Sequence, residues 1–594
     1  MLPGFAFRGV VDGENCLLRK MDSLPNDYHE RLPQGWRNIP LIPNSKVTCG
    51  AVLKDFAGIM GKDFTNLAVT RVLQFVGDLF KSLDLPLKIW PRNHTALLKF
   101  HGYAKFSENR MEKRAYCTSK QCGRMQQEND PTSALCQFPG CGGKVYEGRI
   151  SESIQQLVPL SADIFFDPGL ALGDLLQKPE FVDAIKAEAP GIANALNSTV
   201  APETKAYHSW VNVAAKRVRG FLPTDITTSF TDGGQVFLYV YMVHDYMASS
   251  SNIQGINGTK SYGGMILQIL SLPDYMRTKT KWQVVGQVYC DGKKVHNPVQ
   301  RQEYMVRKFC ELASDGLSVR IGFLDITVTL RVIMMWTQAD RPMMDEIERR
   351  MNFKNKQSCP ERPVNYVQIN GGHSTAPFPL NLEASRRCNW YSDAEVLERR
   401  QLVASGRTVA SELGNFGLSA WGGGLDGVPG LPWYHPRYFE LQEWDHIHAR
   451  LTFRNLRLVT SMMKPATRDL ILTEINSTLS ARGVEWNGDI INHSFSTILG
   501  CMNWVQYDSC AQLHGKFPSS DIEDFWRYWF TYLVFVRKKH ATETDLRVAQ
   551  LARELYLLAL DRNFLHQTHT PNDLSIEWSE ESVRVFGTSL WFGS

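Results

Sequence analysis

The chain lacks long hydrophobic runs and has almost no excess of either charge. Apolar stretches such as LRVIMMW end well short of a membrane span, and MLPGFAFRGVVDGENC has no core of a signal peptide. The 65 Lys and Arg residues nearly balance 61 Asp and Glu residues, for a net charge of +4, which excludes a strongly basic, tail-driven nucleic-acid binder. We therefore expect a soluble intracellular protein without a membrane partner, in which any contact with DNA comes from local patches.

The chain also has little cysteine for its length and no tandem repeat of fixed period. Twelve cysteines in 594 residues are too dilute for a secreted disulfide scaffold, and the missing repeat argues against a solenoid. Hydrophobic residues make up 43% and charged residues 21%, as in ordinary globular proteins. At roughly 150 residues per domain, the length predicts about four compact units, or fewer with insertions.

The apolar pattern predicts a sheet in the middle of the chain and helices in its last third. Four segments are rich in β-branched and aromatic residues: ITTSFTDGGQVFLYVYMVHDY, SYGGMILQILSL, KWQVVGQVYC and LSVRIGFLDITVTLRVIMMWTQAD. Helical spacing marks 56–85, LALGDLLQKPEFVDAIKAEAPGIANAL with punctuation at Pro179 and Pro190, DFWRYWFTYLVFVRKKH, and ETDLRVAQLARELYLLALDRNF. We predict these divisions: an N-terminal arm and helical region 1–100, a cysteine element 101–150, a helical connector 151–220, a sheet region 221–350, a loop-rich and helical insertion 351–485, and a helical C-terminal part 486–594.

Four cysteines form two matched half-sites. CTSKQCG at 117–123 and CQFPGCG at 136–142 are both C-x4-C-G, with 13 residues between Cys122 and Cys136. Each half-site brings two thiolates together, and four soft ligands suit a closed structural Zn2+ site. The set is Cys117, Cys122, Cys136 and Cys141; buried or incidental thiols are the alternative.

Basic residues lie close to these cysteines in the sequence. A structural zinc element can present such residues to DNA phosphates. The alternative is an ordinary solvated face. The candidates are Lys113, Arg114, Lys120 and Arg124.

Two aspartates lie in or after predicted strands. Asp232 is in SFTDGGQVF, and Asp340 ends the segment before RPMMDEIERRM. Paired carboxylates at strand ends can hold Mg2+ for two-metal phosphoryl transfer, because hard cations prefer oxygen ligands. Taken alone, two such aspartates are more often solvated or capping groups.

The aromatic helix DFWRYWFTYLVFV has an ordinary interpretation as buried packing. Trp526, Trp529 and Phe530 are then expected to face other helices. A stacking platform for unpaired bases is the alternative.

A series of segments resembles CACTA-type (En/Spm-like) DDE transposases, in the same order along most of the chain. The cysteine half-sites are similar to those that precede the catalytic region of that family. The further matching segments are TDGGQVF, SYGGMILQILSLPDYMRTKTKWQVVGQV, MMWTQADRPMMDEI, LPWYHPRYFELQEWDHIHARL with a D-x-x-H motif, HTPNDLSIEW and VFGTSLWF.

The resemblance implies an α/β fold. It consists of an RNase H-like mixed sheet with a large, mainly helical insertion, preceded by a zinc-binding region and small helical elements. It also implies a nuclear protein that acts on transposon-end DNA with Mg2+ or Mn2+, with a homo-oligomer as a possible assembly. Asp232 and Asp340 would be the first two metal ligands, and Asp445 with His448 would support the site from the insertion. A hydrogen-bonded pair at i and i+3 of one helix is the alternative for Asp445 and His448.

The chain departs from the family pattern at two places. The third acid is expected just before a tryptophan, and Met502 and Asn503 precede the corresponding Trp504, so Asp508 or Asp489 would have to substitute. The second cysteine of a C-x-x-C that begins at Cys359 is replaced by Arg362. The loss of one carboxylate predicts impaired strand transfer.

Three functions remain open from the sequence. The first is a DDE transposase that cuts and joins DNA. The second is a non-catalytic or domesticated DNA-binding relative. The third is an unrelated, zinc-stabilised interaction protein.

Overall fold

The structure is a computed structural model of the whole chain. It describes residues 74–75, 111–119, 122–126, 133–151, 154–198, 210–249, 260–277, 279–289, 299–339, 343–344, 365–369, 374–378, 391–404, 430–481, 495–538, 541–564 and 576–586. The predicted N-terminal arm and most of the predicted helical segment 56–85 lie outside these residues.

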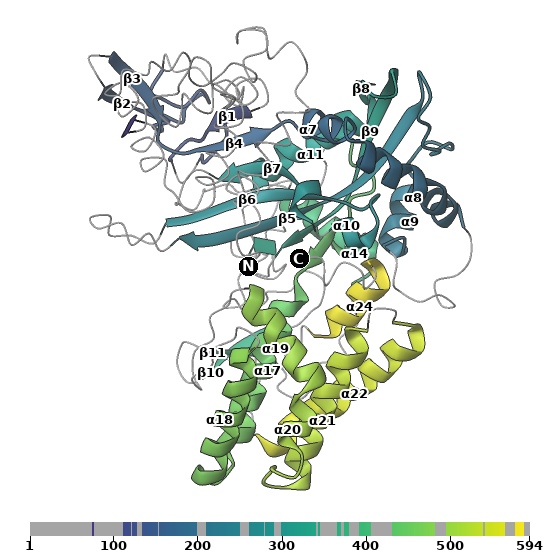
Figure 1. Cartoon of the computed structure of the whole chain (residues 1–594). Coiled ribbons are helices and arrows are strands. Elements are labelled where there is room, and N and C mark those ends of the chain that lie inside the picture. Colours follow the sequence, from purple (N-terminus) through teal and green to yellow (C-terminus); the bar gives the residue numbers. More distant parts are fainter. Residues whose placement is uncertain are drawn as a thin grey trace.

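An eight-stranded mixed sheet forms the upper part of the molecule in Figure 1. The strand order is β1-β4-β7-β6-β5-β9-β12, and β8 pairs with β9 beside this path. The pairs β5–β9 and β9–β12 are parallel, and the other pairs in this sheet are antiparallel. The strands are β1 (Met111–Ala115), β4 (Ala162–Phe166), β5 (Gln235–Ser249), β6 (Lys260–Ile269), β7 (Val284–Tyr289), β8 (Leu317–Ile321), β9 (Ile326–Ala339) and β12 (Glu440–Gln442).

The central strands β5 and β9 are the strands that the sequence predicts most clearly. Val236 to His244 in β5 are all buried, so this strand is covered on both faces, as its continuous apolar run predicts. β9 begins with alternating burial and is then buried on both faces from Val332 to Thr337. The apolar segment from residue 317 to 339 is a hairpin of β8 and β9, which turns at Asp325 with a φ of 53°. The expected α/β chain with a mixed sheet is confirmed.

Two further pairs of strands lie outside the main sheet. They are β2 (Tyr146–Ser151) with β3 (Ile154–Pro159), and β10 (Asn365–Ile369) with β11 (Ser374–Phe378).

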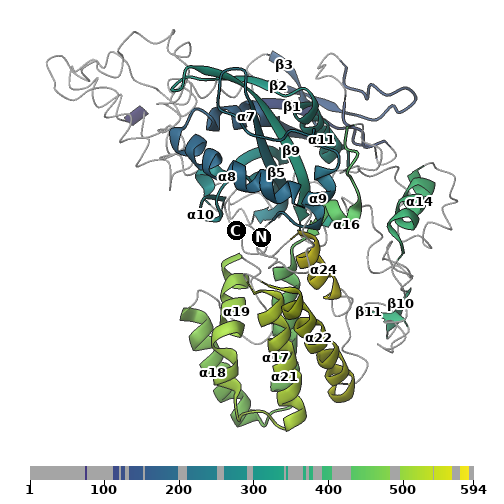
Figure 2. The same cartoon turned by 90° about the vertical axis from the view of Figure 1, so that its right-hand side faces the viewer.

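Helices pack against the sheet and connect its strands (Figure 2). α7 and α11 contact β9, and so does α9. The helices are α7 (Pro168–Leu175), α8 (Pro179–Asn197), α9 (Val213–Arg219), α10 (Asp274–Arg277), a 3-10 turn η4 (Thr280–Trp282), α11 (Val299–Ser314), α14 (Asp393–Ala404) and α16 (Pro436–Phe439).

The two expected prolines act differently in α8. Pro179 occupies the first turn, where a missing N–H costs no intrahelical bond. Pro190 lies inside the helix, which continues to Asn197, so the segment forms two helices, α7 and α8, with their boundary before Pro179 and none at Pro190. Pro190 is exposed, and water can satisfy the carbonyl that loses its partner.

The last third of the chain forms a helical bundle, as its periodicity predicts (Figures 1 and 2). α22 begins with a capping box, in which Thr542 and Asp545 bond to each other's backbone N–H. The bundle consists of α17 (Trp444–Ser461), α18 (Pro465–Ala481), α19 (Phe495–Tyr507), α20 (Ser509–Leu513), α21 (Ser520–Val536) and α22 (Glu543–Asn563).

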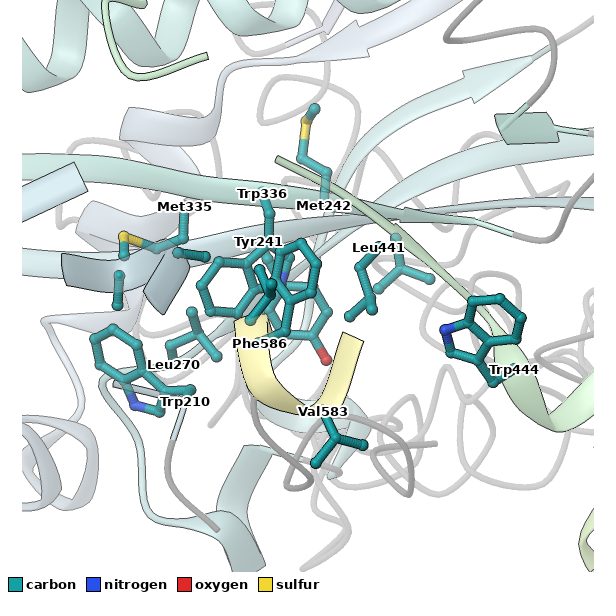
Figure 3. Packing of buried hydrophobic residues seen from close by; sticks show 14 of the residues in the cluster. Trp210, Tyr241, Met242, Leu270, Met335, Trp336, Leu441, Trp444, Val583 and Phe586 are labelled. Atoms are coloured by element: carbon teal, nitrogen blue, oxygen red, sulfur yellow. The ribbon is translucent and has the colours of Figure 1, made fainter. Parts of the chain in front are cut away.

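α24 (Glu577–Phe586) joins the bundle to the sheet. It contacts α21 and α22 on one side and α9 on the other. Phe586 reaches the sheet, where its ring centroid is 5.4 Å from that of Trp336 in β9 (Figure 3). The buried residues of the sheet and of the bundle therefore form one continuous core.

None of the described helices is both long enough and apolar enough to cross a membrane.

Candidate functional site

The four predicted cysteines come together in space. The sulfur atoms of Cys117, Cys122, Cys136 and Cys141 all lie within 4.8 Å of one another. The Sγ–Sγ distance is 3.5 Å between Cys117 and Cys141 and 3.8 Å between Cys122 and Cys136. Four thiolates at about 2.3 Å from a tetrahedral Zn2+ would lie about 3.8 Å apart. The two printed distances are close to this value, so the cluster could hold a metal ion such as zinc.

Tight turns hold the cysteines of each half-site. Gly123 and Gly142 follow Cys122 and Cys141 and have φ values of 55° and 60°, a conformation that favours glycine. The cluster leaves no room for a side chain at Gly143, because a Cβ there would collide with Cys117 Sγ and come within 3.2 Å of Cys141 Sγ. The glycines that follow the half-sites in the sequence are thus required by the turns.

Burial and backbone N–H groups shift the pKa values of these thiols in opposite directions. Burial raises the pKa values of Cys117 and Cys122, although the backbone N–H groups of Ser119 and Arg124 hydrogen-bond to them. The N–H of Gly143 lowers the pKa of Cys141. N–H donors directed at sulfur stabilise the thiolate form, which is the form that binds metal.

The cysteine cluster is attached to the edge of the main sheet. β1 ends two residues before Cys117, and the N–H of Tyr116 donates to the carbonyl of Ser161, next to β4. Because β1 pairs with β4, the cluster and the sheet edge share one hydrogen-bonded framework.

The basic residues near the cluster have different environments. Arg114 forms an ion pair with Glu112, and its guanidinium lies 5.5 Å from the ring centroid of Tyr304. Arg124 and Lys113 are exposed, and Arg124 stacks over Phe138 at 4.9 Å. Lys120 lies outside the described residues. Arg114 is thus engaged within the chain, while Lys113 and Arg124 face solvent.

Asp232 lies in a turn before β5 and not in the strand. Its side chain is exposed, and its Oδ1 accepts a hydrogen bond of 2.8 Å from the N–H of Thr327, at the start of β9. The next residue, Gly233, donates its N–H to the carbonyl of Thr327 at 2.8 Å. Asp232 thus fastens the beginnings of two parallel strands to each other.

This position separates Asp232 from the end of β9. Ala339, the last residue of β9, is twelve residues beyond Thr327, or about 40 Å along an extended strand. Asp340 lies outside the described residues, so its pairing with Asp232 stays a prediction. The structure shows that Asp232 and Ala339 lie at opposite ends of the parallel pair of β5 and β9.

The register brings a different acidic residue to the end of β9. His244 of β5 pairs with Ala339, the last residue of β9. Asp245 is the next residue of β5 after His244, and Asp340 is the next residue of the chain after Ala339. On its other side the Asp245 backbone pairs with Gly264 of β6. Sequence reasoning missed Asp245, although it lies in the same strand-like segment as Asp232, near its other end.

Asp445 and His448 both contact α21. Asp445 forms an ion pair with Arg537 directly after that helix, and both side chains are largely buried. His448 is fully buried, and its Nε2 lies 3.3 Å from the Tyr532 hydroxyl. Burial lowers the pKa of His448 to about 3, so the imidazole is neutral at neutral pH. These residues connect α17 to α21 in the bundle.

The region that corresponds to the family's third acid lies inside the bundle. Met502 and Trp504 are buried in α19, and the Trp504 indole donates to Gln512 Oε1 at 2.7 Å. Asp508 is the N-cap residue of α20. Both helices contact α18, and α19 also contacts α17 and α21. Asp489 lies outside the described residues.

Most of the predicted aromatic residues of α21 pack into the core. Trp526 and Trp529 are buried, and the Trp529 indole donates to Thr452 Oγ1 of α17 at 3.0 Å. Phe530 is half-buried against the same core. The packing interpretation is confirmed for the two tryptophans.

Neither the protein-family models nor the curated proteins that were searched give a match to the chain.

Proposed function

We propose that the chain is a DDE transposase-like nuclear protein with an RNase H-like core that cleaves and joins DNA. The strand arrangement supports this proposal. The comparison concerns five of the eight strands, β5, β6, β7, β9 and β12, and leaves aside β1, β4 and β8. Taken in chain order, the first of these five, β5, is central; the second, β6, and the fourth, β9, flank it; and the third, β7, and the fifth, β12, lie outside them. The fourth and fifth strands run parallel to the first, as in an RNase H-like sheet.

The observation that carries the proposal is the register between His244 and Ala339. His244 and Ala339 form the last pair between the adjacent parallel strands β5 and β9. In the sequence, Asp245 directly follows His244, and Asp340 directly follows Ala339. Acidic residues that follow the same end of neighbouring strands are suited to share divalent cations. Asp245 takes the role that the sequence assigned to Asp232.

α24 supplies the third acid in this proposal. Glu577 is its first residue and directly precedes Trp578, which is the order that the family resemblance implies. The connection to the strand ends runs through Trp444: the N–H of Glu443 donates to the Ala339 carbonyl, and the Trp444 indole donates to Ser582 Oγ, both at 2.9 Å. Glu577 is five residues before Ser582, about 7.5 Å along the helix. With Glu577 in this role, Met502 and Asn503 no longer imply impaired activity.

The acidic residues and the metal ions would have different roles in the reaction. Mg2+ or Mn2+ would activate the attacking water or 3′ hydroxyl and neutralise charge on the scissile phosphate. Asp245, Asp340 and Glu577 would hold the ions through carboxylate oxygens, which such hard cations prefer. The cysteine cluster, with structural Zn2+, would stiffen the sheet edge and present Lys113 and Arg124 to DNA.

Nicking of a supercoiled plasmid tests the proposal. The plasmid carries the genomic DNA that flanks the coding sequence on both sides, and the full-length protein is assayed with Mg2+ or Mn2+. Asp245→Asn, Asp340→Asn and Glu577→Gln are each expected to reduce nicking by about two orders of magnitude or more. Asp232→Asn is the matched control: it removes the same charge but keeps the Oδ1 acceptor for Thr327, and it is expected to retain activity.

Three other outcomes of this assay would each contradict a part of the proposal. Activity that depends on Asp232 and not on Asp245 would overturn this acid set. Salt-dependent DNA binding without nicking would replace the enzyme by the domesticated DNA-binding alternative. If the wild-type protein does not bind the plasmid, a zinc-stabilised interaction protein is the remaining function.

A further inference from the structure

Gln126 lies buried between the two cysteine half-sites. It follows Cys122 by four residues, and only 1% of its surface is exposed. Its backbone N–H donates to the Ala115 carbonyl at 2.9 Å, so the residue is anchored to the end of β1. A buried glutamine must have its carboxamide satisfied, and the partners of this group indicate what it does.

The carboxamide bonds to both half-sites. Its Nε2 donates to the carbonyl of Arg124 at 3.0 Å, directly after the first half-site, and to Cys136 Sγ at 3.5 Å, in the second. Its Oε1 accepts from the N–H of Gln137 at 2.9 Å. Exchanging the oxygen and the nitrogen would direct an NH2 group at the N–H of Gln137, so the orientation is fixed by its partners.

The bond to Cys136 completes a pattern within the cluster. The other three thiols each receive a backbone N–H from the residue two positions later: Ser119, Arg124 and Gly143. At Cys136 a side-chain amide, that of Gln126, donates to the sulfur. Four thiolates around one divalent cation carry an excess negative charge, and N–H donors at each sulfur disperse it.

We propose that Gln126 is a positioning residue that sets the metal affinity of the cysteine cluster by joining its two half-sites and donating to Cys136. This inference rests on the metal site proposed for the four cysteines. It assigns to Gln126 a function beyond filling space: its N–H orients Cys136 and stabilises its thiolate, while its Oε1 holds the turn that carries Cys136.

Gln126→Glu tests this role with almost no change of size. The carboxylate keeps an oxygen acceptor for Gln137 but replaces the donor with a negative oxygen next to Cys136. Zn2+ affinity is measured on the full-length protein by competition with a chromogenic chelator, and Co2+ substitution reports the thiolate-to-metal absorption. We expect Gln126→Glu to weaken Zn2+ binding by about 10- to 100-fold and to alter the Co2+ spectrum.

Gln137→Glu is the matched control, because it introduces the same charge beside the same cysteine on an exposed side chain. It is expected to bind Zn2+ within about threefold of wild type, as an exposed charge is screened by solvent. Equal affinities for wild type, Gln126→Glu and Gln137→Glu would overturn the role of Gln126. Absence of Zn2+ binding by the wild-type protein would instead overturn the metal site itself.

A second variant covers the case in which Gln126→Glu does not fold. Gln126→Met keeps the length of the side chain and adds no charge, but it lacks the N–H donor and the oxygen acceptor. We expect faster transfer of Zn2+ to the chelator from Gln126→Met than from wild type. An unchanged transfer rate in folded Gln126→Met would contradict the proposal.

Discussion

His244 of β5 lies directly opposite Ala339 of β9, in the last pair of their parallel register. In two parallel strands, the N-terminal ends lie side by side and so do the C-terminal ends. Two acidic residues can therefore come close only if both lie toward the same end of the strand pair. Asp232 precedes β5, and its carboxylate is bound to Thr327 at the start of β9. Asp245 lies on the other side of this pairing: it directly follows His244, within β5, at the point where the pairing with β9 ends.

Gly143→Ala is expected to disrupt the cysteine cluster. The new methyl group would collide with Cys117 Sγ and lie 2.9 Å from Ser119 Cβ, which leaves it no space between the turns. We expect Zn2+ affinity, measured by chelator competition, to fall by at least about tenfold.

Gly140→Ala is the control for this substitution. Gly140 has a φ of 75°, but a Cβ there meets nothing within 4 Å. It is expected to cost about 1 kcal/mol of backbone strain and to leave the Zn2+ affinity nearly unchanged. Equal Zn2+ affinities for the two alanine variants would show that the space at Gly143 is not needed.

The buried histidine of α17 predicts a specific pH dependence of stability. The pKa of His448 is lowered by burial to about 3, from about 6.5 in an unfolded chain. Between these values the unfolded state binds more protons, so the contribution of His448 is present above pH 6.5 and is lost as the pH falls toward 3. The loss is about 1.4 kcal/mol per pH unit.

His448→Gln removes this titration. The free energy of unfolding, measured with denaturant, is expected to be lower in the variant at pH 7.5. The difference from wild type should narrow by about 2 kcal/mol between pH 6.5 and pH 5. His514→Gln is the control, because 81% of the His514 side chain is exposed. A constant difference between wild type and His448→Gln across this range would refute the prediction.

The ion pair between Asp445 and Arg537 is expected to be important for the bundle. The two side chains are 15% and 5% exposed, so removal of the arginine leaves a largely buried carboxylate without its counter-charge. We expect Arg537→Leu to lower the free energy of unfolding by about 3 kcal/mol.

The double variant Asp445→Asn/Arg537→Leu should recover part of this loss, because the unpaired charge is gone. Arg320→Leu is the comparison: Arg320 pairs with Asp325, and these side chains are 75% and 83% exposed. Its expected cost is below about 1 kcal/mol. Similar costs for the buried and the exposed pair would contradict the argument from burial.

The contact of Phe586 with Trp336 is expected to hold α24 on the sheet. Phe586 is 2% exposed, and its side chain lies among Trp336 and Tyr241 between α24 and the strands (Figure 3). Phe586→Ala should cost about 3 to 5 kcal/mol and increase the hydrogen exchange of α24 amides. Leu558→Ala, at a position that is 49% exposed, should change stability by less than about 1 kcal/mol. Unchanged exchange in α24 of the Phe586 variant would show that other contacts hold this helix.

The sequence by itself determined the local elements and the cysteine cluster. Strands β5 and β9 are marked by apolar runs, and helices α21 and α22 by helical spacing of apolar residues. Both patterns involve only residues that are close in the chain, so they can be recognised without tertiary information. The C-x4-C-G half-sites are similarly local, since each turn brings two thiols together. Only the association of the two half-sites required the fold.

The tertiary structure decided which distant residues meet. Both Asp232 and Asp245 lie in one strand-like segment, and the direction and register of β9 select between them. The same holds for α24, which lies far along the chain from β9 and whose Phe586 meets Trp336 only because the helix packs back onto the sheet. Gln126 gives no signal in the sequence, because its role depends on a half-site ten residues away that folds against it. Strand pairing and core packing act between segments that are distant in the chain, and no local pattern encodes their register.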